Sequence, residues 1–172
     1  MKITLFMTIS VNGIIARENG DEDFLSDNNW NSFVEVVQEA GCVIWGRKTY
    51  EIVLSNYGEK YLNTIKDVKK VVVSTDLSFR VQDGIILVKS PEEAIESLRK
   101  LGFNSAVVSG GSSLNSSFVK ENLINEIILN VEPVVVGKGI PLFSSQEFDL
   151  KLSEPKIENF VDGIIQLKYK VL

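Results

Sequence analysis

Short apolar runs that alternate with helical segments are the feature of this sequence that most restricts its fold. Residues 3–10 are apolar on both faces, as in a strand that is covered on both sides. Residues 43–45, 71–73 and 106–108 repeat this pattern, with predicted helices between them. Strands that are buried on both faces and connected through helices form parallel sheets. The pattern therefore predicts an α/β fold with a mostly parallel, twisted sheet and helices on both faces.

Capping residues set the limits of the predicted helices. Asp27 or Asn28 can cap a helix that ends at Gly41, because glycine tolerates the left-handed conformation that often ends a helix. Ser90, followed by proline and two glutamates, is a strong start signal for another helix. Further helices are expected after residue 46 and over residues 112–121.

The C-terminal part of the chain is expected to be antiparallel. Its strand-like runs are residues 127–131, 134–136, 157–160 and 164–172. The Asp162-Gly163 pair between the last two runs is a hairpin signal. Apolar side chains alternate with polar ones from Ile165 to Val171, which predicts one dry face and one wet face. No linker or repeat interrupts the pattern, so we expect one domain that ends in an antiparallel hairpin.

Residue types that are rare or missing exclude several classes of chemistry. The 172 residues include no His and a single Cys, Cys42, which lies in an apolar run and reads as a buried residue more than as a nucleophile. Imidazole acid–base catalysis, His-ligated zinc and an intrachain disulfide are excluded, and no metal site is expected. The net charge of −5 argues against nucleic acid and anionic membranes as partners. With no membrane-spanning stretch and no signal-peptide core, we expect a cytoplasmic protein.

Glycines and small polar residues follow three of the predicted parallel strands, where α/β sheets bind ligands. These strand ends carry residues 46–49, 74–75 and 110–112. A Gly-Gly pair before a helix lets the backbone approach a phosphate, which the helix dipole also favours. Arg47 offers a planar fork for phosphate, and two adjacent cations at a helix start oppose the dipole unless an anion is bound. Thr49 is expected to cap this helix.

A simpler interpretation is open for each of these segments. Gly110-Gly111 fits a turn that needs glycine, Ser74-Thr75 can begin a turn, and Asn12-Gly13 is a turn signal before it is a ligand contact. Three anion-binding strand ends in one sheet nevertheless favour a nucleotide with several phosphates. The Gly-x-Gly-x-x-Gly fingerprint of ordinary dinucleotide-binding folds does not occur in the sequence.

Five motifs, in order along the chain, are shared with a known family: residues 10–16, 46–51, 71–74, 108–114, and 123–126 followed by 133–143. On these motifs the chain resembles the dihydrofolate reductase superfamily over nearly its whole length. Within that superfamily it is most similar to the reductase domain of the bifunctional riboflavin-biosynthesis deaminase–reductase, in a standalone form. The resemblance implies a three-layer, dihydrofolate-reductase-like fold over residues 1–172.

The resemblance also implies NADPH as the cofactor and assigns residues to each part of it. Arg47 and Ser74 would hold the adenosine 2′-phosphate. The pyrophosphate would lie against residues at two helix starts: Lys48, Thr49, Gly111 and Ser112. The nicotinamide would be lined by Thr8, Ile15 and Ala16. Further cofactor contacts are expected from Gly46, Gly110, Ser113 and Leu114, and the peptide bond between Gly110 and Gly111 is expected to be cis.

On the substrate side, the resemblance implies that Trp30 and Phe33 wall the pocket, and Asn12 and Asn29 are expected to contact the substrate. Dihydrofolate reductases place a carboxylate near the start of the helix expected from residue 27, and counting back from Phe33 puts Asn29 there. A shift of one or two residues would bring in Asp27 instead. Because an amide carries no charge, this favours a pyrimidine over a folate. Asp27 or a water molecule would deliver the proton.

The expected activity is hydride transfer from NADPH to a small heterocyclic molecule, with 5-amino-6-(5-phosphoribosylamino)uracil of riboflavin synthesis favoured. Arg17 or Lys60 would then bind the substrate phosphate. Dihydrofolate or another pterin is the alternative substrate. A nucleotide-binding module without catalysis is the alternative of another class, and an unrelated flavodoxin-like fold stays open if Gly110-Gly111 lies away from a ligand. The resemblance and an edge strand that needs cover predict a homodimer.

Overall fold

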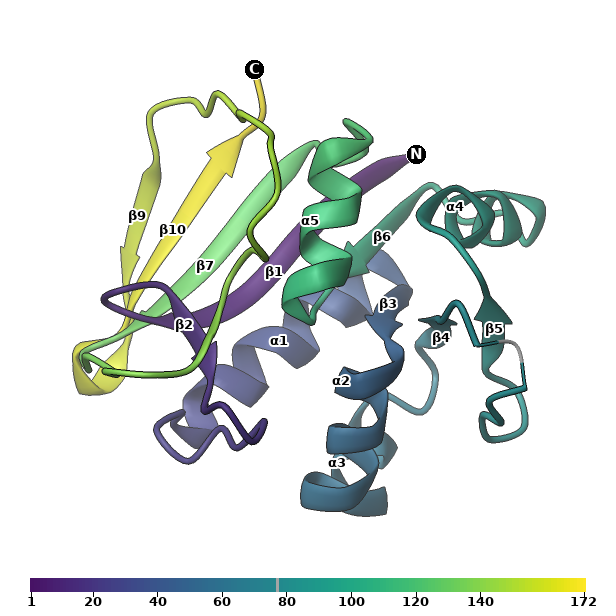
Figure 1. The fold of residues 1–172 in the computed structure, drawn as a ribbon, viewed down its shortest axis with the longest axis horizontal. Coiled ribbons are helices and arrows are strands. Elements are labelled where there is room, and N and C mark those ends of the chain that lie inside the picture. Colours follow the sequence, from purple (N-terminus) through teal and green to yellow (C-terminus); the bar gives the residue numbers. More distant parts are fainter. Residues whose placement is uncertain (77) are drawn as a thin grey trace.

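The computed structural model describes residues 1–76 and 78–172, and in them an eight-stranded sheet carries helices on both faces (Figure 1). The strands of this sheet are β1 (Lys2–Ser10), β3 (Cys42–Gly46), β4 (Lys69–Val73), β5 (Ile86–Val88), β6 (Ser105–Val108), β7 (Glu126–Glu132), β9 (Lys156–Asn159) and β10 (Ile165–Lys170). Two short strands, β2 (Ile14–Ala16) and β8 (Ile140–Pro141), pair separately. The helices are α1 (Asp27–Ala40), α2 (Arg47–Ile52), α3 (Gly58–Thr64), α4 (Pro91–Lys100) and α5 (Ser112–Lys120), with a π-helical turn at Val53–Tyr57 and a 3₁₀ turn at Val161–Gly163.

The strand order confirms the fold class predicted from the sequence. The order is β5-β4-β3-β6-β1-β7-β10-β9. The six strands from β5 to β7 are parallel, β10 runs antiparallel to β7, and β9 runs antiparallel to β10. The predicted antiparallel C-terminal hairpin is therefore present. This order brings the carboxyl ends of β1, β3 and β6 together at the middle of one sheet edge, where doubly wound sheets bind ligands.

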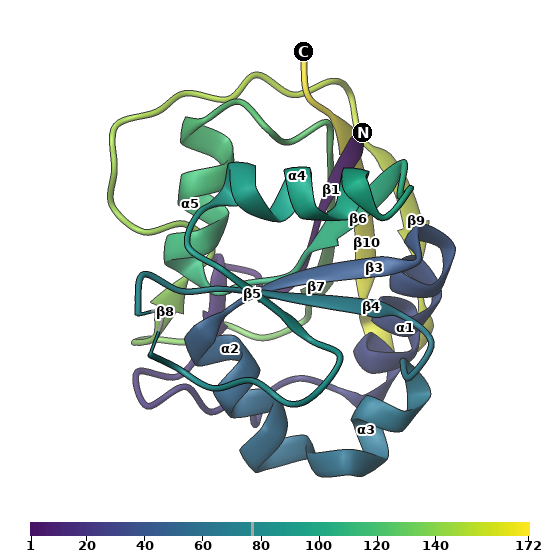
Figure 2. The ribbon, with the colours of Figure 1, turned by 90° about the vertical axis from the view of Figure 1, so that its right-hand side faces the viewer.

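Helices α4 and α5 lie on one face of the sheet and α1 and α2 on the other (Figure 2), and each face has its own hydrophobic cluster. Leu98 of α4 and Phe118 of α5 pack with Ile44 on one face, whereas Phe33 of α1 and Tyr50 of α2 pack with Val43 on the other. Neighbouring residues of β3 thus enter different clusters, because successive side chains of a strand point to opposite faces. This explains why consecutive positions of the central strands, such as Val43 and Ile44, are apolar. None of the helices in the described residues has the length and apolar character needed to cross a membrane.

The N-cap of α1 differs from the sequence prediction. The cap residue is Ser26, not Asp27 or Asn28, and its side chain makes no capping bond. The Ser26 N–H instead donates to the Glu132 carboxylate at 2.7 Å, a contact between residues 106 positions apart. At the other end the prediction is confirmed, since Gly41 ends the helix in the left-handed conformation. A long-range partner thus replaces the local capping signal at the helix start.

The predicted strand over residues 134–136 is absent from the structure. Pro133 cannot donate a ladder hydrogen bond, and the chain leaves the sheet there. The Asn12 side chain then holds this segment by pairing with both the N–H and the C=O of Val136, at 3.0 and 2.8 Å. The chain re-enters regular structure at β8, which pairs with β2 next to the end of β1.

The predicted wet and dry faces of the last strand are reversed at its start. Ile165 is 40% exposed, whereas Gln166 is 2% exposed and donates to Asn130 and Ser32. Tyr169 and Val171, farther along, do pack against the core as predicted. A polar residue enters the interior here because α1 and β7 provide hydrogen-bond partners for it, which alternation alone does not reveal.

Glu121, just after α5, shares hydrogen bonding with Glu92 in the first turn of α4. Partial burial, followed by the Glu92 carboxylate, raises the pKa of Glu121 to about 7. The pKa of Glu92 is lowered by its own backbone N–H, then by the Ser90 hydroxyl and by the Glu121 carboxyl.

This pair predicts a pH-dependent stability. The folded pKa of Glu121 lies above its ordinary value of 4.5, so the folded state binds more protons than the unfolded state between these values. Stability from this group is therefore lost as pH rises from 4.5 to 7. We expect Glu121→Gln to raise the thermal midpoint at pH 8 and to leave it unchanged at pH 4. Equal shifts at both pH values in thermal unfolding would contradict this.

Candidate functional site

A pocket lies at the carboxyl ends of β1, β3 and β6, next to the start of α1. Its lining includes nine residues that were predicted for the site: Thr8, Ile15, Asp27, Asn29, Trp30, Phe33, Thr49, Gly110 and Gly111. The other lining residues are Phe6, Met7, Glu22, Leu25, Ser26, Trp45, Val53, Tyr61 and Ser109. Predicted cofactor residues and predicted substrate residues therefore meet in one place.

An aromatic wall forms one side of this pocket. The ring centroids of Trp30 and Phe33 are 5.0 Å apart, and Tyr61 of α3 meets Trp30 edge-on at 4.9 Å. Phe33 packs in turn against Phe6 and Trp45, at 5.8 and 6.3 Å. Rings in these arrangements gain energy beyond their buried area, so the wall is well supported. Tyr61 was not predicted for the site. It belongs to α3, a short helix after the π-helical turn, which is too short for a helical pattern of apolar residues to be recognised in the sequence.

The glycine turn after β6 lies against the start of α2. The Gly110–Gly111 peptide bond is cis, as the resemblance implied, and the Gly110 C=O accepts the Gly46 N–H at 2.7 Å. A Cβ atom at Gly110 or Gly111 would lie 3.4 or 3.3 Å from Thr49 Oγ1. Glycine at these positions keeps the surface between the two helix starts open. Thr49 makes no capping bond, contrary to the prediction, because the cap of α2 is Gly46.

The start of α5 offers hydrogen-bond donors that the helix itself does not use. The first intrahelical bond runs from the Asn115 N–H to the Gly111 C=O, so the N–H groups of Ser112, Ser113 and Leu114 lie ahead of it. Ser112 is 8% exposed, and its hydroxyl has no hydrogen-bond partner among the described residues. A buried hydroxyl without a partner is costly and points to a missing polar ligand. The Leu114 side chain packs in the core, so its backbone is the part left for a ligand.

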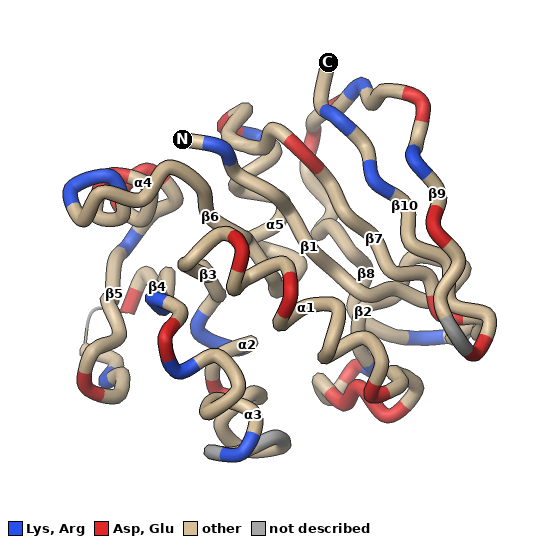
Figure 3. Tube along the Cα trace, turned by 180° about the vertical axis from the view of Figure 1, so that it is seen from behind, with Lys and Arg blue, Asp and Glu red and all other residues tan. Residues whose placement is uncertain are grey.

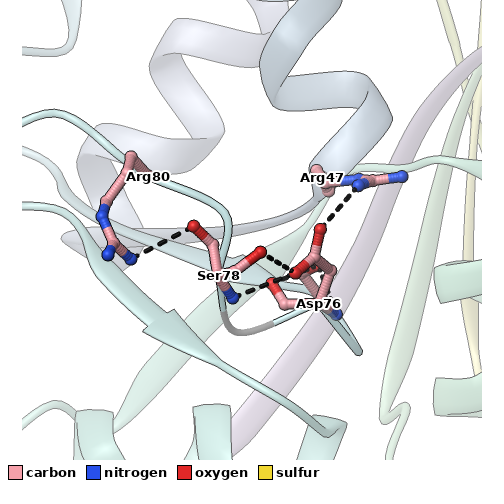
Figure 4. Close-up of polar contacts among 5 residues, drawn as sticks. Arg47, Asp76, Ser78 and Arg80 are labelled. Atoms are coloured by element: carbon pink, nitrogen blue, oxygen red, sulfur yellow. Dashed lines mark hydrogen bonds and ion pairs between the residues drawn. The ribbon is translucent and has the colours of Figure 1, made fainter.

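Arg47 and Ser74, the predicted 2′-phosphate residues, lie outside the pocket lining and both contact Asp76. Figure 4 shows the contact between Arg47 and Asp76. Arg47 Nη1 is 3.4 Å from Asp76 Oδ2, and its guanidinium lies 5.7 Å from the centre of the Phe79 ring. The Ser74 hydroxyl accepts the Asp76 N–H at 3.1 Å. Two contacts from Ser78, its hydroxyl and then its N–H, lower the pKa of Asp76, with a smaller contribution from Arg47. Lys48 is exposed beside Arg47.

Asn12 and Ala16 are two further predicted residues that do not line the pocket. Both polar atoms of the Asn12 side chain are used within the protein, by Val136 and Ser10. Ala16 packs in a small cluster with Ile9 and Ile15. Their predicted ligand contacts stay predictions. The one cysteine, Cys42, is buried in β3, and burial raises the pKa of its thiol to about 12, which fits the expected structural role.

A buried polar network behind Asn29 was missed by sequence reasoning. Glu132, at the end of β7, is 5% exposed and accepts hydrogen bonds from the Ser26 N–H and the Asn29 amide. Asn29 Oδ1 accepts from Asn130, whose own Oδ1 accepts from Gln166. An acidic group therefore does lie at the start of α1, but it is Glu132 of β7 and not a residue of the helix.

The residues present fit a phosphate-bearing dinucleotide. The unpartnered Ser112 hydroxyl and the free N–H groups of α5 suit its pyrophosphate, and the glycine turn leaves room for it. The pocket lining continues from Gly110 and Thr8 to Trp30, so the glycine turn and the aromatic wall border the same space. The site thus joins an anion-binding helix start to an aromatic-walled pocket.

Comparison with known proteins agrees with this architecture. YwjB of Bacillus subtilis is 32% identical over 98% of this chain and 97% of its own. A protein assigned to riboflavin biosynthesis in Shewanella sp. PV-4 has a structure that matches all of this chain and 99% of its own, with 27% identity and a TM-score of 0.81. The Thermotoga maritima deaminase/reductase, at 15% identity and a TM-score of 0.71, shares the fold over 99% of this chain and 56% of its own.

A family model gives the assignment directly. The model of the RibD C-terminal domain matches residues 1–166, which is nearly the whole chain. The match spans β1, the glycine turn and the end of β7, so it includes the segments that build the pocket. This chain therefore belongs to the RibD C-terminal domain family.

Proposed function

We propose that this chain is an NADPH-dependent reductase acting on a pyrimidine of the 5-amino-6-(5-phosphoribosylamino)uracil type. The observation that carries the proposal is the shared pocket: Gly111, next to the unpartnered Ser112 hydroxyl, and Trp30 of the aromatic wall line the same space. Membership of the RibD C-terminal domain family supports it. When bound, NADPH supplies the hydride.

The proposed cofactor contacts follow the strand ends. Arg47 and Ser74 bind the 2′-phosphate, since a guanidinium fork suits phosphate oxygens. The α5 N–H groups and the Ser112 hydroxyl bind the pyrophosphate, with Lys48 nearby. Thr8 and Ile15, which line the pocket together with Gly110, contact the nicotinamide.

The proposed substrate contacts come from α1. Trp30 and Phe33 hold a planar ring by packing against its face. The Asn29 amide is fixed in orientation, because its nitrogen donates to Ser26 and Glu132 while its oxygen accepts from Asn130. The remaining lone pair of that oxygen accepts an N–H group of the substrate. A water molecule or Asp27, which lines the pocket, delivers the proton that the product needs.

One observation favours a second substrate, a pterin without a phosphate. Glu22 and Asp27 line the pocket, and no Lys or Arg is among its lining in the described part of the chain. Acidic residues gather in the loop before α1 (Figure 3). The predicted phosphate ligand Arg17 pairs with Asp23 in this loop, at 2.8 Å. An acidic mouth suits a ring with amidine-like or cationic edges.

A substrate panel separates the two candidates. Following NADPH absorbance, we expect turnover with the phosphoribosylamino-pyrimidine and little with dihydrofolate. Asp27→Asn is expected to leave the affinity for NADPH unchanged, because Asp27 lies on the substrate side of the pocket. For a pterin, the same change would remove a charge-assisted pair and lower turnover about tenfold to a hundredfold. Robust dihydrofolate reduction that disappears in Asp27→Asn would reject the pyrimidine assignment.

The homodimer expected from the resemblance stays a proposal. Its support is β9, an exposed edge strand in which Ile157 is 62% exposed. An uncovered edge strand is a pairing hazard that a second copy would remove. Sedimentation at micromolar concentration distinguishes a dimer from a monomer.

A further inference from the structure

Asp76 contacts both of the residues, Arg47 and Ser74, that the proposed function assigns to the 2′-phosphate. Its Oδ2 lies 3.4 Å from Arg47 Nη1 (Figure 4). Its backbone N–H donates to the Ser74 hydroxyl, and that hydroxyl donates to the Asp76 C=O at 3.2 Å. A carboxylate therefore stands at the place where a phosphate dianion is proposed to bind.

This carboxylate is held in position by its own loop. Asp76 Oδ1 accepts from the Ser78 hydroxyl at 2.6 Å and from the Ser78 N–H at 3.0 Å. Arg80 donates to the Ser78 C=O at 3.1 Å and so supports the turn (Figure 4). The Arg47 and Asp76 side chains are 38% and 48% exposed. Exposed ion pairs are weak, so Arg47 is available to a phosphate while the carboxylate stays beside it.

The two nicotinamide dinucleotides meet this carboxylate differently. A 2′-phosphate gains Arg47 but lies close to a fixed negative charge, which opposes it. A free 2′-hydroxyl can instead donate a hydrogen bond to a carboxylate, as the acidic residue of NAD-binding folds does. We infer that Asp76 is a specificity-determining residue that narrows the preference of this protein for NADPH over NADH. The inference rests on the proposed function.

Binding titrations of the two cofactors test this without an assay of turnover. Tryptophan fluorescence follows NADPH and NADH binding to the wild type, Asp76→Asn and Arg47→Ala. Removing the negative charge in Asp76→Asn is expected to strengthen NADPH binding about three- to tenfold and to leave NADH binding equal or weaker. Arg47→Ala is expected to weaken NADPH binding about tenfold to a hundredfold, with NADH nearly unchanged. Asp149→Asn, an exposed acid outside this site, is the matched control and should change neither.

The outcomes distinguish the inference from the function on which it rests. If Asp76→Asn leaves the ratio of the two affinities unchanged while the wild type binds NADPH, the inference is overturned and the proposed cofactor stands. If the wild type binds neither dinucleotide, the proposed function itself fails. Asp76 is exposed, so the variant is expected to fold, and thermal unfolding of each variant verifies this.

Discussion

Phe118→Ala is expected to lower the free energy of unfolding by about 3–5 kcal/mol, the usual cost of deleting a fully buried phenyl ring. Phe118 has no exposed surface and belongs to the hydrophobic cluster that includes Leu5 of β1 and Ile44 of β3. The sheet cannot collapse into the space that the ring leaves, because α5 is also fixed by Leu114 and Val119. The total free energy of unfolding of a domain is about 5–15 kcal/mol, so this substitution would remove much of its stability.

Chemical denaturation measures this loss, with Val135→Ala as the control. Val135 is 70% exposed, and trimming an exposed apolar side chain changes stability by less than about 0.5 kcal/mol. If both variants lost the same small amount, α5 would not be held to the sheet by this cluster. The start of α5, where the pyrophosphate is proposed to bind, depends on the same packing, so we expect cofactor affinity to fall with stability.

The central strands could be predicted because they are covered on both faces, which requires apolar side chains at consecutive positions. Val43 and Ile44 enter different clusters, so both must be apolar, and the run identifies a strand covered on two faces. Turn residues marked the ends in the same local way, as at Gly41 and Asp162. Where long-range partners decided the outcome, the prediction was wrong. The Gln166 side chain points into the interior because it donates hydrogen bonds to Asn130 and Ser32. Ser26 is the N-cap residue of α1, and its N–H donates to Glu132.

The candidate site likewise contains residues that local sequence signals reveal and residues that only long-range contacts bring there. Glycines and hydroxyls at strand ends are visible in the sequence, and the parallel topology brings Thr8, Thr49 and Gly111 into one pocket. Asp76 was not predicted, because the contact of its carboxylate with Arg47 joins the ends of two different strands. Glu132 was not predicted either. Counting along the first helix pointed to Asn29, and nothing in that count indicates that β7 delivers an acid behind it.

This arrangement gives the acid at the helix start a specific physical task. A carboxylate only accepts hydrogen bonds, so Glu132 forces the Asn29 nitrogen toward itself and the Asn29 oxygen toward Asn130. Asn130 and Gln166 are oriented in turn along the network. The amide that faces the pocket is thereby held in one of its two possible orientations. Glu132 is a positioning residue in this scheme, acting on the substrate through Asn29.

Glu132→Ala is therefore expected to destabilise the protein by about 2–5 kcal/mol, because the Ser26 N–H and the Asn29 amide are left buried without an acceptor. Glu132→Gln keeps the size of the side chain and should lose less. Its amide can also turn its nitrogen toward Asn29, so the orientation of the network is no longer fixed. In Glu132→Gln we expect KM for the substrate to rise while the affinity for NADPH, measured by titration, stays unchanged.

The matched control is Glu126→Ala on the same strand. Glu126 pairs with the exposed Lys2 at 2.7 Å and accepts a hydrogen bond from the Thr4 hydroxyl at 3.3 Å, so removing its carboxylate should cost less than removing the buried Glu132 carboxylate. Denaturation of the three variants ranks their stabilities, and cofactor titration reports on the dinucleotide end separately. A Glu132→Ala variant as stable as Glu126→Ala would mean that the buried carboxylate does not hold the start of α1. A Glu132→Gln variant with equal losses in KM and NADPH affinity would mean that Glu132 supports the whole pocket and not the orientation of Asn29.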